Sequence, residues 1–126
     1  MSRELIQKAF TKMLTEIKQA NRLTDQGELI KAEEIYHNML NQEANYPPAL
    51  YGLAELANKI DEQEVREDLL KRAIEGLKGT TERNQIGVLA IWLSEQAEAL
   101  IILGRQDDAK NCISESEQLI KQNLAE

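Results

Sequence analysis

The feature that most constrains this chain is an interval of 34 residues between small and apolar positions. It joins Ala20 to Ala54, Leu23 to Ala57, Gly27 to Asp61, Tyr36 to Leu70 and Met39 to Ala73. A fixed period of this length is typical of folds that stack one supersecondary unit on the next, because each unit leaves an apolar face for its neighbour to cover.

A third copy of the pattern follows after a longer step. Ala97 lies 43 residues after Ala54, and Gly104 lies 43 residues after Asp61. The difference between the two steps implies about nine extra residues, which are most simply placed between Gly76 and Val88.

Each unit reads as two helices. Apolar residues recur at intervals of one, three and four, which lines one face of a helix, and no stretch alternates in the manner of a strand. Ser2 is expected to cap the first helix, Pro47 to open the third, and Thr80 or Thr81 to cap the fifth. The predicted antiparallel pairs span about 2–44, 47–78 and 81–124 of a single domain, residues 1–126.

The prediction is thus an all-α fold of six helices. The alternative is an antiparallel helical bundle, which also joins amphipathic helices by short turns. A bundle does not require a 34-residue register, so the register favours stacked hairpins.

The residues that match best in the first unit are Ala20, Leu23, Gly27, Ala32, Tyr36 and Pro47. This pattern resembles the tetratricopeptide repeat (TPR) family, over about residues 14–120. Five features depart from it: Arg66 stands where helix B usually has a small residue, Leu70 and Ile113 replace the aromatic residue, Glu16 replaces the early tryptophan, and Pro47 comes later than the family's proline. The resemblance implies a short TPR-like superhelix, whose concave face binds a peptide or helix of a partner protein.

Transferring the family's groove positions gives a set of predicted partner-binding residues: Ile17, Asn21, Thr24, Tyr51, Glu55, Asn58, Lys59, Ile91, Ser94, Glu95, Glu98 and Ile101. One subfamily grips a terminal carboxylate with cations and amides, but here only Asn21 matches that set. The acidic Glu95 would repel a carboxylate. The expected ligand instead has apolar anchors and a Lys or Arg that meets Glu55, Glu95 or Glu98.

Charge and composition restrict the remaining functions. The net charge of −7 and the absence of a Lys/Arg cluster argue against a nucleic-acid partner. No apolar run approaches the roughly 18 residues of a membrane helix, and the single cysteine, Cys112, fits a reducing compartment, so a cytoplasmic location is expected. The lone His37 cannot build a paired catalytic site, so we expect no enzyme activity, no metal and no cofactor.

The expected function is therefore protein binding, as an adaptor or scaffold. Two alternatives stay open: a client-specific chaperone of the kind used in secretion, and a regulator that senses a peptide or small ligand. The fifth helix, with more apolar residues than one face needs, is either central in the stack or exposed to a partner. A homodimer is a further expectation from this surplus.

Overall fold

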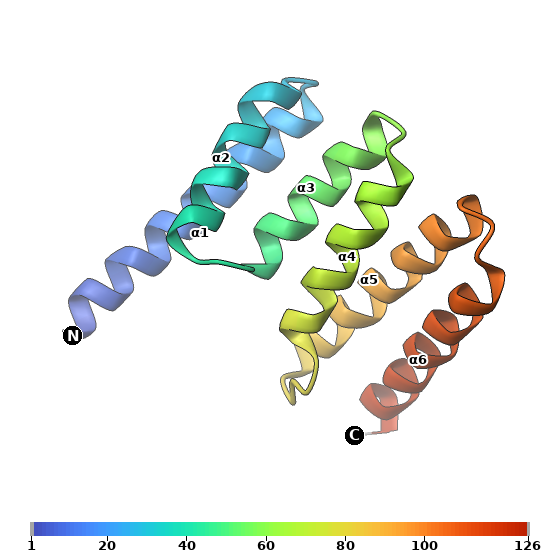
Figure 1. Ribbon diagram of the computed structural model, residues 1–126. Helices are drawn as coiled ribbons and strands as arrows, with labels where there is room; N and C mark the ends of the chain where they lie inside the picture. Colours follow the sequence, from blue (N-terminus) through green and yellow to red (C-terminus); the bar gives the residue numbers. More distant parts are fainter. Residues whose placement is uncertain (1, 126) are drawn as a thin grey trace.

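The computed structural model describes residues 2–125, which form helices and turns without a strand. The helices are α1 (Arg3–Asp25), α2 (Leu29–Gln42), α3 (Pro47–Lys59), α4 (Gln63–Leu77), α5 (Arg83–Ile102) and α6 (Gln106–Ala125). Consecutive helices run in opposite directions and form three hairpins set side by side (Figure 1). The all-α prediction of three stacked helix pairs is confirmed.

The turn inside each hairpin is the same turn three times. Gly27, Asp61 and Gly104 have positive φ angles of 81°, 59° and 80°. The next residue donates its N–H back across the turn at 2.8 Å: Glu28 to the Leu23 carbonyl, Glu62 to Ala57 and Arg105 to Leu100. This left-handed closure satisfies the last carbonyls of a helix. The steps of 34 and 43 residues thus reflect a repeated backbone geometry.

The extra residues of the third unit lengthen its first helix. Pro47 begins α3 and corresponds to Ala90 in the 43-residue register, yet α5 begins seven residues earlier, at Arg83. The expectation that Thr80 or Thr81 caps α5 is wrong, since Glu82 is the N-cap and its side chain makes no capping bond. Ser2 does cap α1, accepting the Leu5 N–H at 3.2 Å.

The core runs through the stack between neighbouring hairpins. Tyr36, Met39, Leu50, Leu70 and Leu93 are its largest fully buried side chains. Each helix packs on the next along the chain, and α1 also meets α3. This chain of neighbours distinguishes the fold from a bundle, in which helices surround one shared core.

The apolar helix α5 is buried on part of its surface and open on the rest, where Ile91, Ile101 and Ile102 are each more than half exposed. Among the described residues it alone has the length and composition of a membrane-crossing helix. It packs between α4 and α6, and Trp92 and Leu93 lie in the core. A core helix of a folded domain passes the same test of length and composition.

Candidate functional site

The odd-numbered helices converge on one side of the stack, which we call the inner side. Within residues 2–125, the backbones of α1 and α3 come close to each other, whereas those of α2 and α4 stay farther apart. The ring of Tyr51 on α3 stacks on Trp92 of α5, with centroids 5.0 Å apart and planes 10° from parallel. The predicted partner-binding residues come from these three helices.

A polar hollow of about 240 Å³ opens between the first three helices. Its lining residues are Asn21, Thr24 and Asp25 of α1, Tyr36 of α2, and Tyr51, Gly52 and Glu55 of α3. Four of the seven, Asn21, Thr24, Tyr51 and Glu55, belong to the predicted set. The hollow carries two carboxylates and no cationic side chain.

The floor of the hollow is Tyr36, whose side chain is buried. Its hydroxyl donates to Asn21 Oδ1 at 2.6 Å and lies 3.4 Å from the Thr24 hydroxyl. Burial raises the pKa of Tyr36; the bond to Thr24 lowers it, and the charges of Glu55 and Asp25 raise it further. Tyr36 is therefore a neutral donor fixed at the base of the site.

The wall of the hollow is tied to α5 through Tyr51, which donates its hydroxyl to Glu95 Oε1 at 3.0 Å. The other carboxylate oxygen, Oε2, is buried without a hydrogen-bond partner. Burial raises the pKa of Glu95, and the charges of Glu55 and Glu98 add to this. The bond from Tyr51 and the charge of Arg66 act in the opposite direction.

Glu98 forms an ion pair with a buried arginine. Arg66, whose side chain is 4% exposed, places Nη1 2.9 Å from Glu98 Oε1. The same nitrogen donates to Gln63 Oε1 at 3.2 Å. Of the three acids predicted to meet a basic ligand, only Glu55 lines the hollow.

The other predicted residues lie outside the hollow. Ile17 packs against the part of the core that contains Tyr36 and Met39. Asn58 Oδ1 accepts a hydrogen bond from Gln63 at 3.0 Å. Ser94 donates to the Ile91 carbonyl at 2.7 Å on an exposed part of α5. Lys59 is exposed at the end of α3, and Ile101 lines a separate hollow with α6.

The residues that the sequence did not point to are Asp25, Tyr36 and Gly52. Tyr36 was missed because the predicted groove drew only on the first helix of each pair. Asp25 and Gly52 do lie on those helices, but they were not among the groove positions transferred from the family. A Cβ on Gly52 would collide with the Tyr36 ring, so the missing side chain is what lets this ring line the hollow. A glycine inside a strongly apolar helix was the available signal.

The hollow is suited to bind hydrogen-bond donors and positive charge. Carboxylates accept strong, charge-assisted hydrogen bonds from Lys or Arg. No group of three His, Cys, Asp or Glu side chains in residues 2–125 is arranged to hold a metal ion.

The sequence matches no protein-family model and no curated protein. The resemblance to the tetratricopeptide repeats therefore stays a prediction from the 34-residue register.

Replacing Glu95 by glutamine is expected to change how stability depends on pH. Folding raises the pKa of Glu95 above its usual value of 4.5. Between pH 4.5 and the raised pKa, the folded protein therefore binds more protons than the unfolded chain. Stability then falls as pH rises from about 4.5 through the raised pKa. Glu95→Gln keeps an acceptor for Tyr51 and removes this loss.

Urea unfolding at several pH values measures the effect. The stability of Glu95→Gln relative to the native chain should rise with pH and then level off. The exposed Glu34→Gln on α2 serves as a control and should show no such trend. A constant difference for Glu95→Gln would show that its carboxylate titrates normally.

Proposed function

We propose that this protein is a non-catalytic, TPR-like interaction module that acts as an adaptor or scaffold. The inner side binds a peptide or helix of a partner, and a Lys or Arg of that partner enters the polar hollow. The observation that supports this most directly is the pairing of Asp25 and Glu55 around one hollow without a lining cation. Such a site recognises positive charge through its two carboxylates, with Tyr36 as the floor and Tyr51 as a wall.

Selection from a random peptide library tests the proposal. Peptides that bind the native protein should share one Lys or Arg position flanked by apolar residues. Glu55→Gln should weaken a selected peptide about tenfold, the usual scale for losing a charge-assisted hydrogen bond. Isothermal titration calorimetry gives the affinities.

The matched control is Glu34→Gln, which removes an equal charge from an exposed part of α2 outside the hollow. It should leave the affinity unchanged. Peptides selected without any basic position, or equal affinity for Glu55→Gln and the native chain, would contradict the proposed site.

A further inference from the structure

A second concave surface, which we call the outer groove, lies between α2 and α4. The backbones of these helices stay apart, and α3 forms the floor between them. Two adjoining hollows of about 460 and 300 Å³ share Glu33, Leu56 and Ile60. Val65 and Leu69 of α4 complete one wall.

The outer groove has apolar side chains that remain open to solvent. Ile30 is 82% exposed, Ile60 is 61% exposed and Val65 is 48% exposed, although each lines the groove. Contiguous exposed apolar surface of this kind marks protein–protein contact sites.

The rim of the outer groove is acidic. Glu28, Glu33 and Glu62 line it, and His37 is its one basic lining residue. The pairs Glu28–Lys31 and Glu33–His37 have nitrogen–oxygen distances of 3.9 Å, and all four side chains are exposed. Exposed pairs of this length contribute little, so the rim keeps its attraction for a basic partner.

The chain presents a basic amphipathic helix of its own. Helix α1 has 23 residues and its antiparallel partner α2 has 14, so the start of α1 extends beyond the hairpin (Figure 1). We call residues 3–14 the overhang. Leu5 and Ile6 are 57% and 55% exposed there.

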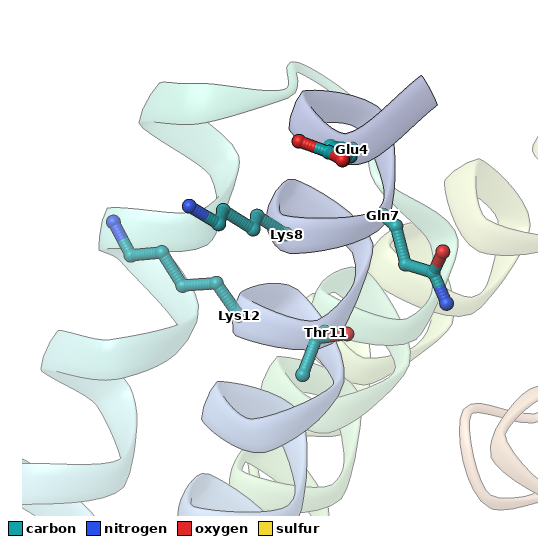
Figure 2. A pocket seen from close by; sticks show the side chains of 5 residues that line it. All are labelled: Glu4, Gln7, Lys8, Thr11 and Lys12. Atoms are coloured by element: carbon teal, nitrogen blue, oxygen red, sulfur yellow. The ribbon is translucent and has the colours of Figure 1, made fainter. Parts of the chain in front are cut away.

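The overhang is positive although the whole chain is negative. Between residues 3 and 14 it carries Arg3, Lys8 and Lys12 against one acid, Glu4, while the net charge of the protein is −7. Lys8 and Lys12 extend to the same side of α1 (Figure 2). Lys12 approaches Glu16 at 3.8 Å and stays 66% exposed. Leu5, Lys8 and Lys12 are three and four residues apart, so both lysines lie on the same face of the helix as Leu5.

We propose that the overhang of one copy binds in the outer groove of a second copy. Leu5 and Ile6 would cover Ile60 and Val65, while the lysines would meet the acidic rim. Pairing overhang with overhang would oppose like charges, and so would pairing groove with groove. Charge therefore selects the mixed contact. This proposal is independent of the partner expected in the polar hollow.

The arrangement of the two surfaces allows a closed dimer. The outer groove includes Gly27 and Glu28 at the turn after α1, whereas the overhang lies at the opposite end of that helix (Figure 1). Two copies side by side in opposite directions can thus exchange both contacts around a two-fold axis.

Sedimentation equilibrium of the full chain tests the proposal with two blocked variants. Leu5→Glu with Ile6→Glu disables the overhang, and Ile60→Lys with Val65→Lys disables the groove. The native chain should dimerise, and each double variant alone should dissociate with a constant raised about a hundredfold. An equimolar mixture should associate again, because one overhang and one groove remain intact.

The control is Ile120→Lys on α6, which is 47% exposed and outside both surfaces. It should dimerise like the native chain, and circular dichroism should show that every variant keeps its helices. A native chain that is monomeric at high concentration would overturn the proposal. So would a mixture of blocked variants that stays monomeric, or an overhang variant that still dimerises.

Discussion

Gly52→Ala is expected to lower the free energy of unfolding by about 1–3 kcal/mol, the usual range for overpacking a core. The new Cβ would meet Cε1 and Cζ of the Tyr36 ring. That ring is 1% exposed and its hydroxyl is bound to Asn21, so it has little freedom to move aside. The loss should appear even though alanine is the better helix former by about 1 kcal/mol.

Urea denaturation measures the change, and Gly87→Ala provides a matched control. Gly87 lies within α5, and a Cβ there would have nothing within 4 Å. Alanine at position 87 should therefore stabilise the protein by up to about 1 kcal/mol. Equal stability of Gly52→Ala and the native chain would mean that the Tyr36 ring is free to shift.

The repeat architecture could be predicted because its turns make local demands on the sequence. A left-handed residue is needed after the first helix of each pair, and Gly27 and Gly104 meet that need without steric cost. Asp61 adopts the left-handed conformation in the second pair, with a φ of 59°, because aspartate tolerates this region better than most side chains. The recurrence of these turns, after 34 and then 43 residues, indicated the hairpin boundaries.

The N-cap of α5 could not be predicted as well as the place where the helix begins. The third pair was expected from about residue 81 and α5 begins at Arg83, but its N-cap is Glu82 and not Thr80 or Thr81. Among the added residues 83–89, Arg83 donates to the Asn123 carbonyl of α6 at 2.7 Å and Leu89 is buried. Such contacts stabilise the added turns as helix, and they depend on how the hairpins pack.

The polar hollow was predicted only in part, for a different reason. Asn21, Thr24, Tyr51 and Glu55 could be placed on one side of the stack by the groove positions that the resemblance to the tetratricopeptide repeats implies. The internal bonds that occupy Glu95 and Glu98 join residues 44 and 32 positions apart in the chain, Tyr51 to Glu95 and Arg66 to Glu98. Such pairs depend on how hairpins pack, and one sequence carries no direct sign of them.

Two arginine–glutamate pairs with the same nitrogen–oxygen distance offer the last test, because their arginines differ in burial. Arg66–Glu98 and Arg105–Glu64 both have nitrogen–oxygen distances of 2.9 Å. The Arg66 side chain is 4% exposed, whereas that of Arg105 is 45% exposed. Arg66→Ala should cost about 2–4 kcal/mol, because it removes a buried side-chain stem together with an ion pair whose arginine is shielded from water. Arg105→Ala should stay within about 0.5 kcal/mol of the native chain.

Arg66→Met separates packing from charge. Methionine refills most of the volume, and Glu98, 62% exposed, can return to water when its partner is lost. Urea unfolding should therefore show Arg66→Met well above Arg66→Ala in stability, since a buried ion pair contributes little beyond what apolar packing supplies. Ala32 and Ala109 occupy the equivalent positions in the other hairpins and are buried. If Arg66→Ala proved as stable as the native chain, the second hairpin would have collapsed around alanine as its neighbours do, and the arginine would have no structural role.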